Sequence, residues 1–136
     1  MPLLNISALE LIPQQPPFVF VDKLIEVEED SFTAEYIVKP NTPLSDDNCF
    51  TEAGIVEFVA QSMAAHTGYV SEKRANMGLI GAVKNLAIHE VPKVGEVLRS
   101  EIKILNRIFN VTFVQAKVFA LNEEIASCEL KVADPE

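Results

Sequence analysis

The chain is organised around one stretch in which apolar residues recur without a clear polar face. Residues 50–69 read Phe-Thr-Glu-Ala-Gly-Ile-Val-Glu-Phe-Val-Ala-Gln-Ser-Met-Ala-Ala-His-Thr-Gly-Tyr. Thr51 is a good N-cap, and Gly68 is typical of a C-terminal stop. We therefore predict a helix between these two marks. A helix without a polar face is buried by other elements on most of its sides.

Alternation of apolar and polar residues predicts strands on both sides of this helix. A short helix at residues 5–11, strands at 18–28 and 32–39, and a loop are expected before it. Strands are expected after it at 77–88, 96–106, 108–120 and 126–132, the third with a bulge where the alternation changes phase. One long central helix and a mostly antiparallel sheet of about six strands predict a single α+β domain over residues 1–136.

One carboxylate interrupts the apolar helix. Glu57 lies in its middle, Gln61 follows one turn later on the same side, and alanines flank the pair at helical spacing. Ionisable groups in such surroundings are candidates for a functional site. A structural contact with a lysine or a backbone amide explains the same glutamate equally well at this stage.

The bulk composition narrows the class of protein. The formal charge of −9 argues against a general attraction to nucleic acid or to an anionic membrane. The sequence has neither an apolar run of the ~20 residues that span a bilayer nor the pattern of a signal peptide. Cys49 and Cys128 are interpreted as free thiols, so we expect a cytoplasmic protein. The sequence shows no metal-ligand cluster, phosphate-binding glycine loop or nucleophile elbow, so we expect no metal and no cofactor.

An acidic partner would need a local basic patch on this acidic chain. The candidates are Lys73–Arg74, Lys84, Lys93 and Arg107. Each of them is interpreted first as a solvated surface charge.

Three segments, in this order, resemble the hot-dog superfamily and within it the 3-hydroxyacyl-[acyl-carrier-protein] dehydratases. Residues 12–23, Ile-Pro-Gln-Gln-Pro-Pro-Phe-Val-Phe-Val-Asp-Lys, are similar to the family pattern Leu-Pro-His-Arg-x-Pro-Phe-x-x-x-Asp-Arg. Residues 54–61, Gly-Ile-Val-Glu-Phe-Val-Ala-Gln, are similar to the central-helix motif with its Glu-x-Met-Ala-Gln core. Residues 82–88 and 91–96 are similar to the family motifs Lys-x-Ala-x-Phe and Pro-x-x-Gly-Asp. The resemblance covers about residues 9–132, is nearest to the branch found in aryl-polyene-type gene clusters, and implies a hot-dog fold.

The resemblance also implies roles for particular residues. In that family a histidine moves the proton as water leaves a 3-hydroxyacyl thioester, and a helix carboxylate from the other subunit orients the reacting groups. Backbone N–H groups near the start of the helix polarise the thioester carbonyl. By this resemblance the catalytic candidates are Glu57 at the carboxylate position, its helical companion Gln61, and Gln14 at the histidine position. The implied substrate-binding residues are Gly54, Pro17, Phe18 and Lys84.

Gln14 is the main departure from the family pattern. An amide donates and accepts hydrogen bonds but is no general base near neutral pH. Loss of positioned acid–base catalysis lowers a rate by ~10²–10⁴, so dehydration should be impaired or absent in this chain alone. His66 lies nine residues beyond Glu57, about 180° round an ideal helix, and is expected to be a packing or interface residue. His89 is expected at the surface.

Three functions stay open. The first is a dehydratase-like protein that binds acyl-carrier-protein or coenzyme A thioesters in fatty-acid or polyene-type biosynthesis. The second is a non-catalytic subunit of a heteromeric dehydratase whose other hot-dog subunit carries the histidine. The third is a hot-dog acyl thioesterase in which Glu57 activates water. The long strands with apolar faces predict a homodimer, a higher oligomer or such a heteromer.

Overall fold

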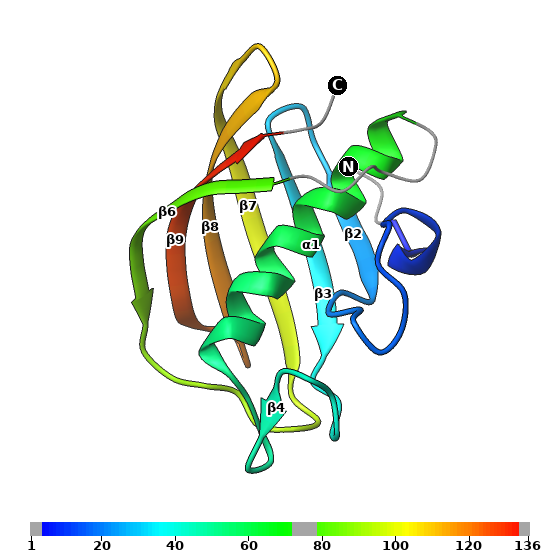
Figure 1. Ribbon diagram of the computed structural model, residues 1–136, viewed down its shortest axis with the longest axis vertical. Helices are drawn as coiled ribbons and strands as arrows, with labels where there is room; N and C mark the ends of the chain where they lie inside the picture. The colour runs from blue at the N-terminus through cyan, green and yellow to red at the C-terminus, as the bar shows by residue number, and fades with distance from the viewer. Residues whose placement is uncertain (1–3, 72–78, 134–136) are drawn as a thin grey trace.

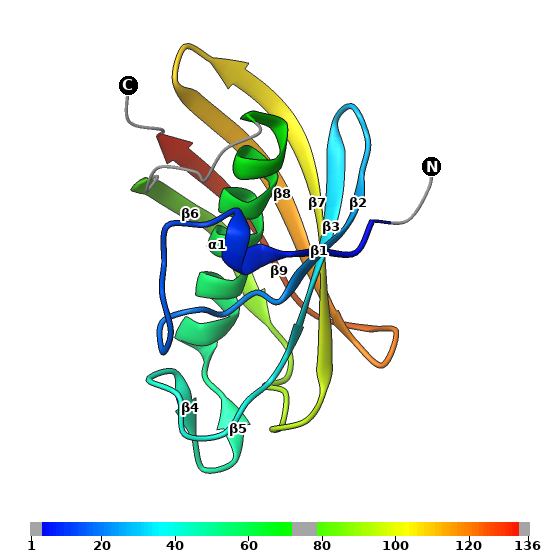
Figure 2. The same ribbon diagram turned by 90° about the vertical axis from the view of Figure 1, so that its right-hand side faces the viewer.

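A curved antiparallel sheet wraps one long helix in this protein. The computed structural model describes residues 4–71 and 79–133. Seven strands form the main sheet in the order β1-β2-β3-β7-β8-β9-β6, and β4 pairs with β5 in a separate small ribbon (Figure 1). The strands are β1 (Ile6–Ser7), β2 (Lys23–Val27), β3 (Ser31–Ile37), β4 (Ser45–Asp46), β5 (Cys49–Phe50), β6 (Leu79–Ile88), β7 (Val97–Ile108), β8 (Val111–Ala120) and β9 (Glu123–Ala133). Helix α1 (Glu52–Ser71) lies against one face of the main sheet (Figure 2).

This arrangement confirms the predicted α+β class and the hot-dog fold. The main sheet has one strand more than expected because β1 pairs with β2, with Ile6 opposite Leu24. The predicted helix at residues 5–11 is instead strand β1 followed by a 3-10 helix at Ala8–Glu10. The backbone N–H of Ala8 donates to the Asp22 carbonyl (2.9 Å), so this segment follows the sheet.

Helix α1 begins where the sequence predicts, but it ends later than predicted. The Thr51 hydroxyl caps the helix by accepting a hydrogen bond from the N–H of Gly54 (3.1 Å). The helix continues through Gly68 to Ser71, so the prediction that Gly68 ends it is wrong. Gly68 is buried, and a β-carbon there would collide with the backbone carbonyl of Leu11. The glycine therefore permits close packing of the N-terminal segment on the helix.

The predicted burial of α1 is confirmed along most of its length. Tyr36 of β3 contacts the rings of Phe20, Phe50 and Phe58 at centroid distances of 5.2–6.3 Å. A buried hydrogen bond also joins the helix to the sheet: the hydroxyls of Ser62 in α1 and Ser100 in β7 lie 2.9 Å apart. Ser62 also donates to the Phe58 carbonyl (2.7 Å), so this buried pair is hydrogen-bonded.

The bulge predicted in the strand at residues 108–120 lies instead on the neighbouring strand β7. Pairing of β7 with β8 shifts between Ile104 and Asn106, whereas β8 stays in register with β9 from Val111 to Val118. Val114 is buried and Phe113 is half-buried, so Phe113 belongs to the other face of an uninterrupted strand. An apolar residue on the outer face produced the apparent change of phase.

The two cysteines are free, as predicted, with Cys49 half-buried and Cys128 buried. Burial, and then the nearby Glu129 carboxylate, raise the pKa of the Cys128 thiol. None of the helices in the described ranges is both long and apolar enough to cross a membrane. The expected polar connection at residues 71–76 and the first two residues of the strand expected at 77–88 lie almost wholly outside the described residues.

Candidate functional site

An apolar cavity of about 740 Å³ lies between α1 and the sheet. Its helical wall extends from Glu57 to Ser71, roughly 21 Å along the helix axis at 1.5 Å per residue. Aromatic and aliphatic side chains supply most of the lining, among them Phe20, Phe32, Leu44, Met63, Val70, Ile104 and Val132. Sites for small molecules are mostly apolar and have a few polar groups that fix orientation. The polar residues of this wall are therefore the candidates for function.

Gln61 ties the proline-rich segment to the helix. Its Nε2 donates to the Phe18 carbonyl (2.9 Å) and to Oε2 of Glu57 (3.0 Å), while its Oε1 accepts from the N–H of Phe20 (2.6 Å). The side chain is only 1% exposed, and these contacts use both of its amide donors and its carbonyl oxygen. Gln61 therefore holds the Glu57 carboxylate and the backbone of Phe18 and Phe20 in place, and a catalytic role for it stays a prediction.

Gln14 and Glu57 of one chain line the same cavity, whereas the resemblance implied a carboxylate contributed by the other subunit. Both side chains are half-buried. The Oε1 atom of Gln14 is buried and has no hydrogen-bond partner among the described residues. An unsatisfied buried acceptor costs about 1–3 kcal/mol, so a ligand that donates a hydrogen bond there would be favoured. Glu57 is not part of any ion pair among the described residues. The structure therefore gives no support to an ion pair as the reason for this carboxylate.

The predicted substrate-binding residues separate into two groups. Phe18 lines the cavity with a side chain that is 57% exposed. Pro17, Gly54 and Lys84 are not among the described residues of the lining. Pro17 is exposed, and Lys84 is an exposed residue of β6 opposite Glu129 of β9. Their role in substrate binding stays a prediction without support from this cavity.

Gly54 has a structural reason to be glycine. Its N–H is occupied by the Thr51 hydroxyl, so it is not free to polarise a carbonyl. A β-carbon at Gly54 would lie 2.5 Å from the Phe50 ring. The Phe50 ring therefore leaves no room for a side chain at this position.

His66 lines the cavity, which the sequence did not indicate. Its ring is buried and stacks on Phe32 at a centroid distance of 4.1 Å, which confirms the predicted packing role. Burial, and then the positive charge of Arg107, lower the pKa of His66 to about 4. The 180° estimate missed the cavity because the cavity wraps round the helix and includes residues from more than one of its sides.

His66 does not replace the missing histidine. It is nine residues, or roughly 14 Å of helix axis, beyond Glu57. A group whose pKa is about 4 is also a weak base near neutral pH. His89 is exposed and does not belong to the described lining.

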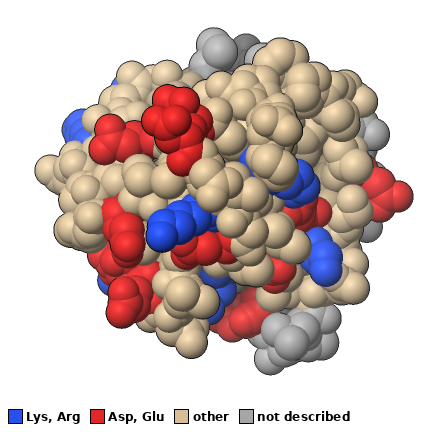
Figure 3. All heavy atoms as spheres, turned by 90° about the horizontal axis from the view of Figure 1, so that it is seen from below, with Lys and Arg blue, Asp and Glu red and all other residues tan. Residues whose placement is uncertain are grey.

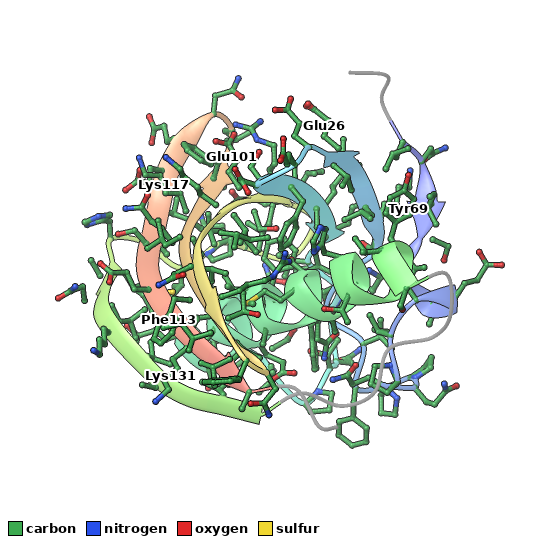
Figure 4. All side chains as sticks on the ribbon, turned by 90° about the horizontal axis from the view of Figure 1, so that it is seen from above. Glu26, Tyr69, Glu101, Phe113, Lys117 and Lys131 are labelled. Atoms are coloured by element: carbon green, nitrogen blue, oxygen red, sulfur yellow. The ribbon has the colours of Figure 1, made fainter. Side chains whose placement is uncertain are left out.

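The basic residues named as candidates for binding an acidic partner lie in different places. Arg107 lines the cavity, whereas Lys84 and Lys93 are exposed elsewhere and Lys73–Arg74 lie outside the described residues. The face seen from below carries acidic side chains beside scattered basic ones (Figure 3). On the outer face of the sheet, Glu101 and Lys117 are direct cross-strand partners that point away from α1 (Figure 4). No group of three or more histidine, cysteine or acidic residues able to hold a metal is found in the described ranges.

Comparisons with known proteins agree with this architecture. The family model described as ApeP-like, ApeP dehydratase, matches residues 6–136. An uncharacterised thioester dehydrase of Halalkalibacterium halodurans is 29% identical over 125 residues, which cover 84% of this chain and 80% of the relative. A 3-hydroxyacyl-[acyl-carrier-protein] dehydratase, FabZ, of Ruminiclostridium cellulolyticum is 28% identical over 138 residues, 96% of each chain.

Among solved structures, a chain of the dehydratase heterocomplex ApeI:P from Xenorhabdus doucetiae superposes with a TM-score of 0.88. The match covers 98% of this chain and 93% of that chain, at 13% identity, so it supports the fold alone. The family model, in contrast, extends over nearly the whole sequence. This chain belongs to the ApeP-like dehydratase family of hot-dog proteins.

Proposed function

We propose that the protein binds 3-hydroxyacyl thioesters of an acyl carrier protein, in fatty-acid or polyene-type biosynthesis, and is a poor dehydratase by itself. One observation carries this proposal. Gln14 and Glu57 both line one apolar cavity, and the residue at the histidine position has no titratable nitrogen. A cytoplasmic site of action fits the two free thiols.

The chemistry defines what each group contributes. Dehydration breaks the C2–H and C3–O bonds of a 3-hydroxyacyl thioester, forms the C2=C3 double bond and releases water. Glu57 accepts a hydrogen bond from the substrate hydroxyl, and Gln61 holds this carboxylate in place. The Gln14 amide holds the substrate but does not accept the C2 proton. Binding is thereby retained while proton transfer is lost.

Replacing Glu57 by Gln tests this assignment. We expect Glu57→Gln to weaken the binding of 3-hydroxydecanoyl-pantetheine about tenfold, the effect of losing one hydrogen bond to a charged acceptor. The near-isosteric amide should change the free energy of unfolding by less than about 1 kcal/mol, since Gln61 still finds an acceptor. Calorimetric titration and thermal melts measure the two quantities.

Glu52→Gln is the matched control. Glu52 begins the same helix, is exposed and is not among the described residues of the cavity wall. Glu52→Gln should leave the binding of 3-hydroxydecanoyl-pantetheine unchanged. A large loss of stability in Glu57→Gln with unchanged binding would make Glu57 part of the scaffold only.

The free edge of the sheet favours a second candidate, a subunit of a hot-dog oligomer. β6 pairs with β9 on one side, and no described strand covers its other side. Its side chains Ile80, Val83 and Leu86 are 38–46% exposed. A long exposed edge with apolar side chains invites pairing with another chain. The similar Xenorhabdus chain comes from a heterocomplex, so a histidine-bearing hot-dog subunit is the alternative to a second copy.

Light scattering of the purified protein should give about twice the chain mass of 15.0 kDa. Val83→Lys places a charge on the free edge and should shift the protein toward the monomer. Lys131→Gln, on the neighbouring β9 and exposed, is a control that should leave the mass unchanged. A wild-type monomer that stays monomeric beside a histidine-bearing partner would exclude the oligomer proposal.

Glu57 also keeps the thioesterase alternative open, because a carboxylate in the cavity can activate water without a histidine. The two reactions give different products from one substrate. A thioesterase releases free pantetheine thiol, whereas a dehydratase forms an enoyl thioester. Thiol release that Glu57→Gln abolishes would favour the thioesterase.

A further inference from the structure

We propose that the part of the cavity beside His66 is an anion-binding subsite, in which the Arg107 guanidinium binds a carboxylate or phosphate group of the ligand. This inference rests on the proposed function for the thioester ligand. It adds a second, charged contact at a distance from Gln14 and Glu57. The reasons lie in the register of the sheet and in the charge of the cavity wall.

The sheet brings Arg107 into the cavity by register. Arg107 of β7 lies opposite Thr112 of β8, Thr112 lies opposite Val132 of β9, and Val132 lies opposite Ile80 of β6. All four residues line the cavity. They therefore form one row across four strands. The β7 bulge between Ile104 and Asn106 precedes this row and determines on which face of β7 Arg107 lies.

Arg107 is a cation without a described counter-charge. The described ion pairs use Lys39, Arg99 and Lys117 as their cations. Among the described residues Arg107 makes one hydrogen bond, from its backbone N–H to Oδ1 of Asn106 (2.8 Å), and this bond does not involve the guanidinium. A guanidinium stays protonated at all relevant pH values.

The positive charge acts inside the cavity. Arg107 contributes to the lowered pKa of His66, so its charge is felt at a buried ring on the cavity wall. The only acidic residue in the described lining is Glu57, roughly 14 Å of helix axis from His66. Thr67 and Thr112 also line the cavity.

A simpler explanation is that the apolar stem of Arg107 covers the wall while its head stays in water. Arg107 is indeed exposed. That explanation predicts no preference for anionic ligands. An arginine fork at a mostly apolar cavity fits an amphiphile instead, because it binds carboxylate or phosphate oxygens in pairs while the chain occupies the apolar wall.

Two parts of an acyl thioester can carry this anion. One is the phosphate of the phosphopantetheine arm, and the other is a carboxylate at the far end of a dicarboxylic acyl chain. Calorimetric titration with three ligands distinguishes them: decanoyl-pantetheine, decanoyl-phosphopantetheine and the ω-carboxylate analogue of decanoyl-pantetheine. Each is titrated into the wild type, into Arg107→Gln and into Lys103→Gln. Lys103 is an exposed cation of the same strand that does not belong to the described cavity wall, so it controls for net charge.

We expect one anionic ligand to bind the wild type and Lys103→Gln about tenfold more tightly than the neutral one, as for a hydrogen bond to a charged group. Arg107→Gln should remove this preference and keep the affinity for the neutral ligand. The favoured ligand identifies the phosphate or the chain end as the source of the anion. Equal binding of all three ligands to the wild type would overturn the subsite and leave the proposed function intact. If none of them binds, both proposals fail.

Discussion

Replacing Gln14 by His is expected to raise the dehydration rate of the purified protein about 100-fold. The proline-rich segment already holds residue 14 at the cavity wall, and Gln61 fixes that segment through Phe18 and Phe20. A histidine there would supply the titratable nitrogen that the amide lacks, and positioned acid–base groups contribute ~10²–10⁴ in rate. Formation of the enoyl thioester from 3-hydroxydecanoyl-pantetheine measures the effect by its ultraviolet absorbance.

Gln15→His is the matched control for this gain. Gln15 is the next residue, is exposed and does not contribute to the described wall of the cavity. A histidine there should leave the rate unchanged. If the wild type is already fully active and Gln14→Ala does not alter its rate, the assignment of residue 14 is wrong.

The free energy of unfolding is expected to fall by roughly 3 kcal/mol between neutral pH and pH 4 through His66 alone. Burial and then Arg107 lower the pKa of this ring from 6.5 to about 4 in the folded protein. Between these two values the unfolded chain binds a proton that the folded protein excludes. The stability contribution is therefore complete above pH 6.5 and is lost as the pH falls toward 4.

Carboxylates also titrate in this window, so the test compares two proteins. His66→Phe keeps an aromatic ring against Phe32 and removes the titration. The difference in unfolding free energy between wild type and variant, from denaturant titrations at several pH values, isolates the histidine. A difference that does not vary with pH would show that His66 is not the titrating group. His89→Phe changes an exposed histidine and should retain the wild-type slope.

Much of the fold could be predicted because its signals are local. The cap at Thr51 and the apolar run after it predict where α1 begins, and alternating residues predict β3, β8 and β9. These patterns record which side of each element faces the core. The end of the helix was not predictable. Gly68 is a glycine because a side chain there would collide with the carbonyl of Leu11, a residue far away in the chain, and not because the helix ends.

The candidate site was predictable only in part. The resemblance named Gln14 and Glu57, and both line one cavity of the chain, although it implied a carboxylate from the other subunit. It also named Gly54 and Lys84, which are not among the described residues of the wall. The N–H of Gly54 donates to the capping Thr51 hydroxyl, and Lys84 is an exposed residue of β6. A motif records residue types in order, and the direction of each side chain depends on its neighbours in space.

The sequence by itself determined the order of two strands, one long helix and four further strands, and the loss of a titratable group at residue 14. Only the tertiary structure decided that Gln61 positions Glu57, that His66 is buried against Phe32 and that Arg107 reaches the same cavity. The physical reason is that these contacts join segments far apart in the chain. They depend on strand register and on the packing of the helix against the sheet, and a shift of one residue in a strand reverses the face on which a side chain lies.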